Sequence, residues 1–187
     1  MAPTSASRRM PMICSSVSGS GIDLAIRYAS ARHVPPGSPR LFDEVVVPVA
    51  SPSLGVDALR SPRALSGLTL LEFEERYPWL QWGHWLESRG WQSARPRGSL
   101  QFNQYDLVIQ AALAGQGVAL GRRELIRPML DDGRLVALAP PRRGETQGYA
   151  YWLVRAPGTA RPEVERVADW IMREAAQQAG KSAPRRR

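Results

Sequence analysis

The sequence predicts an α/β fold in which strands and helices alternate around a largely parallel sheet. Short apolar runs of strand character recur along the chain, with helix-like segments between them. The stretch 102–121, FNQYDLVIQAALAGQGVALG, sets an apolar helical pattern and a valine-led strand on either side of two glycines. A long segment after Pro162 repeats apolar residues at helical spacing.

The composition is typical of a globular protein. The 187 residues are 43% hydrophobic and 22% charged. The formal charge of +8 lies mostly at the two ends, so it does not predict a nucleic-acid interface in the body of the chain. The single cysteine excludes an internal disulfide, and neither a membrane-spanning apolar run nor a signal peptide pattern is present. These features predict a cytoplasmic protein that does not enter the membrane.

The first strands follow a leader. Residues 1–20 are rich in serine and show no periodicity, which predicts a disordered leader. Residues 21–28, GIDLAIRY, alternate apolar and polar side chains and predict a strand, followed by a proline-rich loop. Residues 41–52, LFDEVVVPVASP, predict one further strand.

The middle of the chain continues the alternation. Residues 61–67, SPRALSG, predict a short helix, and residues 68–73 a buried strand. Trp79, Trp82 and Trp85 recur at helical spacing. Because aromatic residues at this spacing usually face a core, we interpret them as packing residues and not as a ligand-stacking site.

The stretch 102–121 predicts a tight helix–strand connection. Asn103 followed by Asp106 indicates a capped helix that starts at Gln104. Gly115 is expected to end the helix in the left-handed conformation, and Gly117 to begin the next strand. Such a connection leaves the helix N-terminus beyond the carboxyl end of the preceding strand, where open sheets bind ligands and where amides favour an anion. The same pattern is also typical of a compact turn that binds nothing.

The C-terminal third predicts strands at residues 134–140 and 148–154, and then the clearest helix in the chain. One apolar stripe of that helix is expected to be buried: Val164, Val167, Ala168, Ile171 and Ala175. Residues 179–187 predict a basic, disordered tail.

The ordered series DLAIRY, VVVPVASPSL, F.....VIQAALAGQGVALG, LDDGRLVAL, YAYWLV and PEVERVADWI resembles the effector-binding domain of LysR-type transcriptional regulators. The resemblance is strongest to the subgroup that includes glycine-cleavage and β-lactamase regulators, and runs from about Gly21 to Ala176. It implies a two-lobed fold similar to periplasmic binding proteins, with a small-molecule effector in the cleft between the lobes. Residues 21–51 and 154–178 would form lobe one, and residues 52–153 lobe two.

The chain also departs from this family. A family effector domain begins with a strand, a helix and a strand ahead of DLAIRY, and the whole regulator adds a helix-turn-helix; residues 1–20 resemble neither. We therefore expect an N-terminally truncated chain with an incomplete lobe one, which would reach DNA only through the missing helix-turn-helix. The resemblance further implies a homodimer or higher oligomer and a small, anionic effector.

The resemblance also implies which residues contact the effector. By their positions in the family motifs these are Arg27, Tyr28, Phe102, Asn103, Gln104, Gly121, Arg122 and Tyr151. Arg27 is suited to pair with an effector carboxylate, and equally to form a structural salt bridge. Asn103 fits a helix cap as well as a ligand contact, and Tyr151 fits the core.

No motif indicates catalysis, a metal or a cofactor. His33 and His84 have no Cys or carboxylate at ligand spacing, and neither a nucleophile elbow nor a phosphate loop is present. We therefore expect a protein that is not an enzyme and holds no metal or cofactor. Two alternatives remain: a stand-alone solute-binding protein on the same scaffold, which would need export, and an enzyme on a similar α/β scaffold.

Overall fold

The computed structural model describes residues 21–74, 77–142, 144–158 and 161–181, which form two compact units. Of the described residues, those within 1–43 and 149–187 belong to unit 1 and those within 44–148 to unit 2. The predicted leader lies outside the described residues. The division between the units falls between residues 43 and 44 and between residues 148 and 149. The lobe bounds expected from the sequence stay a prediction.

The strands are β1 (Leu24–Ser30), β2 (Arg40–Asp43), β3 (Val46–Ala50), β4 (Thr69–Phe73), β5 (Gly98–Phe102), β6 (Val118–Arg122), β7 (Val136–Ala137) and β8 (Tyr149–Arg155). The α-helices are α1 (Trp82–Ser88), α2 (Tyr105–Leu113), α3 (Arg127–Asp131) and α4 (Pro162–Lys181). Short 3-10 helices are η1 (Ala31–His33), η2 (Pro52–Leu54), η3 (Pro62–Leu65) and η4 (Pro78–Leu80).

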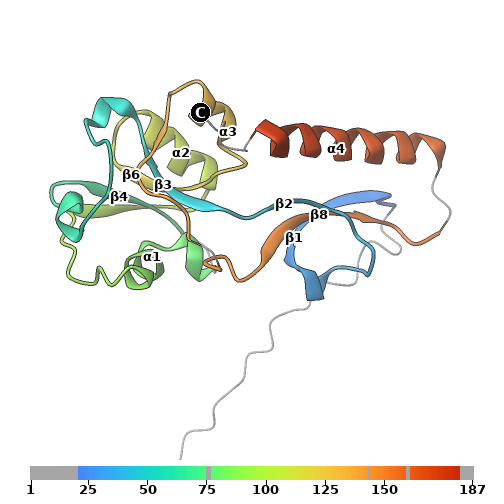
Figure 1. The fold of residues 1–187 in the computed structure, drawn as a ribbon, viewed down its shortest axis with the longest axis horizontal. Helices are drawn as coiled ribbons and strands as arrows, with labels where there is room; N and C mark the ends of the chain where they lie inside the picture. The colour runs from blue at the N-terminus through green and yellow to red at the C-terminus, as the bar shows by residue number, and fades with distance from the viewer. Residues whose placement is uncertain (1–20, 75–76, 143, 159–160, 182–187) are drawn as a thin grey trace, which may run out of the picture. The chain divides into compact units, whose positions relative to one another are not determined.

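Unit 1 is a three-stranded antiparallel sheet in the order β1-β8-β2, with α4 along one face (Figure 1). The core beneath the helix consists of Leu41, Tyr151, Leu153, Ala168 and Ala175. The predicted final helix is confirmed, and it continues to Lys181, beyond the expected end at residue 178.

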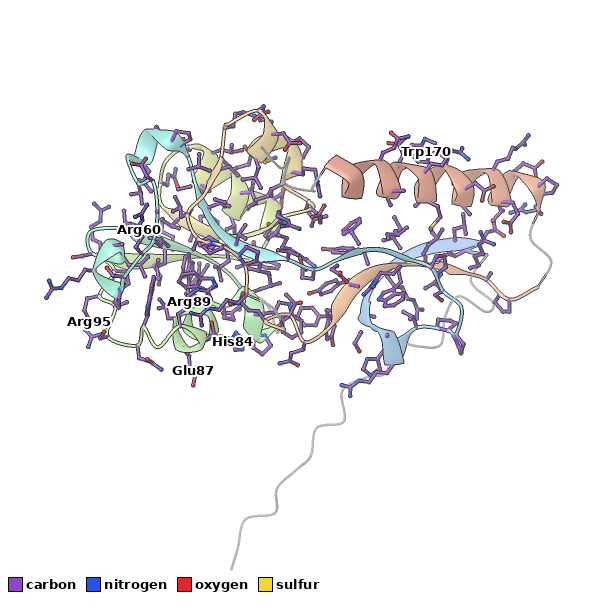
Figure 2. The ribbon with its side chains drawn as sticks, in the orientation of Figure 1. Arg60, His84, Glu87, Arg89, Arg95 and Trp170 are labelled. Atoms are coloured by element: carbon purple, nitrogen blue, oxygen red, sulfur yellow. The ribbon has the colours of Figure 1, made fainter. Side chains whose placement is uncertain are left out.

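The prediction that Val167 belongs to the buried stripe of α4 is wrong. Ala168 and Ala175 are buried, but Val167 is 48% exposed. Successive helical residues are about 100° apart, so the side chain beside Ala168 points away from the sheet. Trp170, which is 56% exposed, also points outward (Figure 2).

Unit 2 contains, within its described residues, a five-stranded sheet in the order β5-β4-β6-β3-β7. The helices α2 and α3 cover one face of this sheet and α1 lies on the other (Figure 1). Trp79, Trp82 and Trp85 are each at most 3% exposed, which confirms them as core residues. The indole N–H of Trp82 donates to the carbonyl of Leu71 at 3.1 Å and so ties α1 to β4.

The expectation of a largely parallel sheet is wrong. Only β4 pairs in parallel, with β5 and with β6, while β3 is antiparallel to both β6 and β7. The single strand expected at residues 41–52 is two strands, β2 and β3, which belong to different sheets. Apolar periodicity identifies a strand but carries no information about the direction of its neighbours.

The helix of the stretch 102–121 starts one residue later than expected. Gln104 occupies the N-cap position with an extended backbone, makes no side-chain capping hydrogen bond, and is followed by Tyr105 as the first helical residue. Asn103 therefore is not the cap. The apolar face is confirmed, because Val108, Ala111 and Ala112 are buried against the sheet.

Gly115 and Gly117 have the structural roles that the sequence predicted. Gly115 has a φ of +70° and ends α2 in the left-handed region. Gly117 is required for a close approach, because a Cβ atom there would lie 2.3 Å from the carbonyl oxygen of Thr69. The backbone of β6 therefore enters the sheet directly against β4.

We predict that Gly117→Ala lowers the free energy of unfolding by about 1–3 kcal/mol, because backbone atoms must move apart to admit the methyl group. Urea denaturation of the purified chain measures this change. Gly98→Ala is the matched control, since a Cβ there meets nothing within 4 Å. Equal stability of the two variants would contradict the close approach.

Candidate functional site

The carboxyl ends of β4, β5 and β6 meet at one edge of the unit 2 sheet, because these three strands are parallel. Phe73 and Phe102 pair at the ends of β4 and β5, and the peptide N–H of Glu74 donates to the carbonyl of Phe102 at 2.8 Å. Asn103 and Gln104 then lead into α2. Three of the predicted effector residues therefore lie together at this edge.

A buried ion pair stands at the same edge. Arg122 ends β6, and its Nη2 and Nε atoms lie 2.6 and 2.8 Å from Oε2 of Glu44, the residue that opens unit 2. The two side chains are 13% and 2% exposed. Arg122 was predicted as an effector contact, and its guanidinium charge is balanced by this carboxylate.

Tyr105 connects the ion pair to the start of α2. Its hydroxyl oxygen accepts a hydrogen bond from the peptide N–H of Arg122, with 2.6 Å between the oxygen and the nitrogen. Its ring packs edge-on against Phe73, and the guanidinium carbon of Arg122 lies 5.9 Å from its centroid. Burial raises the pKa of Tyr105 well above its usual value, so the phenol stays neutral.

Glu44 and Tyr105 are the two residues of this edge that the sequence did not indicate. Glu44 carried a signal, since it is a carboxylate directly before a buried valine run. A buried carboxylate requires a cationic partner, but 78 positions separate it from Arg122. Nothing in the sequence selects Arg122 from the other arginines.

Gly121, another predicted effector residue, serves packing. It is buried, and a Cβ atom there would lie 2.5 Å from Cδ1 of Ile126 and 2.9 Å from Cγ2 of Val49. Because Gly121 has no side chain, Ile126 at the N-cap of α3 and Val49 of β3 can pack directly against β6. This finding gives Gly121 a structural reason that is independent of any ligand.

The remaining predicted residues, Arg27, Tyr28 and Tyr151, belong to unit 1. Tyr28 and Tyr151 are paired across β1 and β8 with ring centroids 5.1 Å apart. Arg27 is paired with Trp152 in the same register and therefore points to the opposite face of the sheet from Tyr28. Tyr151 is 9% exposed and part of the core beneath α4.

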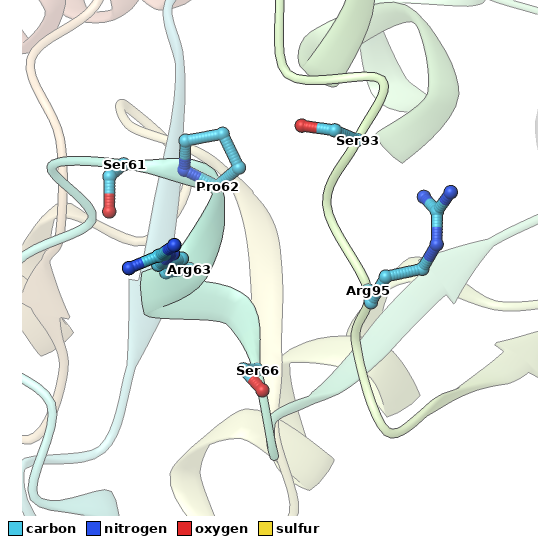
Figure 3. A pocket seen from close by; sticks show the side chains of 6 residues that line it. All are labelled: Ser61, Pro62, Arg63, Ser66, Ser93 and Arg95. Atoms are coloured by element: carbon cyan, nitrogen blue, oxygen red, sulfur yellow. The ribbon is translucent and has the colours of Figure 1, made fainter.

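Unit 2 also has a shallow hollow of about 380 Å³ between η3 and the loop after α1. Its lining residues are Ser61, Pro62, Arg63, Ser66, Ser93 and Arg95. The side chains of Arg63 and Arg95 extend away from one another (Figure 3), and Arg95 donates to the carbonyls of Gln92 and Ala94 in its own loop. The two guanidinium groups therefore do not converge on one ligand.

The part of the chain that the structure describes offers neither a metal cluster nor a membrane-spanning helix. No cluster of three His, Cys, Asp or Glu side chains is placed to hold a metal ion. No helix there has the length and apolar character needed to cross a membrane.

Comparison with known families identifies the domain. The family model for the LysR substrate binding domain matches residues 15–176. The chain belongs to this family. The resemblance noted in the sequence motifs is thereby confirmed, together with the assignment as an effector-binding domain of LysR-type regulators.

Several curated relatives of this LysR domain are transcriptional regulators. The HTH-type transcriptional regulator DsdC of Escherichia coli (strain K12) is 26% identical over 157 residues, which cover 81% of this chain and 50% of that protein. The glycine cleavage system transcriptional activator of the same organism is 32% identical over 117 residues, or 62% of this chain and 37% of that protein. The chain thus spans about half the length, or less, of these relatives.

Solved structures share the fold. The effector-binding domain of AmpR from Citrobacter freundii superimposes with a TM-score of 0.62 at 21% identity, covering 84% of this chain and 76% of that chain. The effector domain of AmpR from Pseudomonas aeruginosa gives 0.61 at 23% identity, covering 87% and 77%. These likenesses confirm the predicted α/β, two-lobed fold similar to periplasmic binding proteins.

We predict that the stability of the chain falls above about pH 10 partly because of Tyr105. Its folded pKa is raised, so above the ordinary tyrosine pKa the unfolded chain loses this proton first and unfolding becomes easier. Stability is retained below that pH and lost as the pH rises. Urea denaturation between pH 9 and 12 gives the free energy of unfolding at each pH. In Tyr105→Phe this free energy should fall less steeply with pH, by up to about 1.4 kcal/mol per pH unit. Parallel profiles for the two proteins would contradict the burial of a neutral phenol.

Proposed function

We propose that this effector-binding domain senses a small anionic metabolite at the carboxyl edge of the unit 2 sheet, around Phe102, Asn103 and Gln104. The observation that carries the proposal is the position of the α2 N-terminus at this edge, with no capping hydrogen bond from the side chain of Gln104. Ligands of open α/β sheets bind beyond the carboxyl ends of the strands.

The chemistry of this edge favours an anion with its own hydrogen-bond acceptors. The first-turn amides of α2 point along the helix axis toward the edge, and the helix dipole supports a negative charge there by about 0.3–1 kcal/mol. Because Glu44 neutralises Arg122, the arginine orients neighbouring groups more than it attracts charge. Asp106 in the first turn opposes an anion, which favours a ligand that makes directional hydrogen bonds to Asn103 and Gln104 over one bound by charge alone.

The predicted effector residues of unit 1 rest on the family resemblance alone. Arg27, Tyr28 and Tyr151 stay predictions of the family resemblance, with Arg27 as the cation that pairs with an effector carboxylate. The packing of Tyr28 and Tyr151 against the core under α4 gives both rings a structural role beside the predicted one.

The relatives support a role in transcription. We propose that the effector changes the arrangement of two or more copies of the domain, and that a DNA-binding segment outside this chain carries the result to DNA. The site would be one of binding without catalysis, and the regulator would act in the cytoplasm, where metabolites and promoters meet. The regulators among the relatives support this proposal over a secreted solute-binding protein.

We predict that small carboxylates, including free amino acids, raise the melting temperature of the chain, and that Asn103→Ala weakens the binding of any stabilising compound by about tenfold or more. Loss of a hydrogen bond to a charged ligand group is the reason. Thermal shift and calorimetric titration measure the two effects.

Gln110→Ala is the matched control, because Gln110 is exposed on the same helix and away from its N-terminus. A compound that binds wild type, Asn103→Ala and Gln110→Ala equally well does not use this edge. In the same assay, unchanged affinity in Arg27→Ala would remove Arg27 from the effector site.

A further inference from the structure

A second hollow, of about 330 Å³, lies in unit 2 between α1 and the segment that precedes β8. Its lining residues are His84, Ser88, Arg142, Gly144, Glu145 and Gln147. The volume is within the range of small-molecule sites, at its lower end. Because α1 and α2 lie on opposite faces of the sheet (Figure 1), this hollow is separate from the proposed effector contacts at the start of α2.

A buried ion pair holds the wall of this hollow. The Nη1 atom of Arg89 lies 2.6 Å from Oε1 of Glu145, and the two side chains are 5% and 4% exposed. The guanidinium carbon of Arg89 lies 3.7 Å from the ring centroid of Trp85, and the hydroxyl of Ser88 donates to Glu145 at 3.3 Å. The segment is therefore fixed against α1 before any ligand arrives.

Three buried side-chain nitrogens on α1 and its C-cap residue have no hydrogen-bond partner within the described part of the chain. One of them is Nδ1 of His84, a lining residue. The other two are Nη2 of Arg89 and Nε1 of Trp85. Buried nitrogens of this kind are nearly always paired in folded proteins, and of these three residues His84 is the one that lines the hollow.

The charges around the hollow favour an anion. Arg89 and Arg142 are opposed by one carboxylate, that of Glu145, which is already bound to Arg89. Arg142 is exposed and donates to the carbonyl of Ser88, which holds its guanidinium group over α1. Gln147 has a φ of +51°, a conformation that is uncommon for a residue other than glycine and is often retained at binding sites.

We propose that this hollow is a second ligand site of the domain, which binds a small oxyanion, a carboxylate or a phosphate group, through Arg142, His84 and residues 144–147. The guanidinium of Arg142 and the imidazole of His84 donate to the oxyanion. Arg89 is a positioning residue, because it holds Glu145 and Ser88 and lies behind the wall. The proposal does not depend on the proposed effector site.

Titration of the ¹⁵N-labelled chain with inorganic phosphate and, separately, with acetate tests this proposal, with chloride adjusted to keep the ionic strength constant. The backbone amides of Ser88, Glu145 and Gln147 and the indole N–H of Trp85 report on the hollow in assigned NMR spectra. We expect saturable shifts of these signals with at least one of the two anions. Saturable shifts with phosphate alone would indicate a phosphorylated ligand, and saturable shifts with acetate alone would indicate a carboxylate ligand.

Arg142→Gln should weaken the affinity by about tenfold, since it removes a charge-assisted hydrogen bond. Arg63→Gln is the matched control, because Arg63 is an exposed arginine that lines the other hollow. His84→Gln is the second variant and should also weaken binding. Shifts that stay linear with both anions, or equal affinities in Arg142→Gln and Arg63→Gln, would overturn the proposal.

Discussion

The buried pair of Glu44 and Arg122 is the interaction on which the edge of unit 2 depends. It joins Glu44, two residues before β3, to the last residue of β6, and the peptide N–H of the same arginine holds Tyr105 at the start of α2. Removing one partner of such a pair leaves an uncompensated buried charge, which costs about 3–5 kcal/mol. The start of α2 is thus fixed relative to two strands before a ligand binds, and this preorganisation lowers the entropy lost on binding.

Gly117 and Gly121 also determine the position of this edge, through close packing. Gly117 lets β6 lie directly against the backbone of Thr69, and Gly121 lets Ile126 and Val49 close over the end of the same strand. The short connection between α2 and β6 fixes where the helix ends. The length of the helix, about 1.5 Å per residue, then fixes where it begins. Packing and electrostatics therefore act on the same few residues that the family resemblance assigns to the effector.

Local patterns in the sequence were sufficient for most elements. The apolar spacing of α4, the helical spacing of Trp82 and Trp85 in α1 and the glycines around α2 each predicted a feature that is present. Three features could not be predicted from the sequence: the direction of β3, the division of one expected strand into β2 and β3, and the partner of Glu44. Each of these depends on which distant segments meet, and periodicity does not encode that choice. Tyr105 was missed because a tyrosine at a helix start has no distinctive local signal.

The most direct measurement is the amide NMR spectrum of the ¹⁵N-labelled chain with and without a carboxylate that stabilises it thermally. We predict that the largest saturable shifts fall on the amides of Gln104, Tyr105 and Asp106, because the ligand is expected to bind at the start of α2. Saturable shifts confined to other parts of the chain, with these three amides unmoved, would contradict an effector site at this edge.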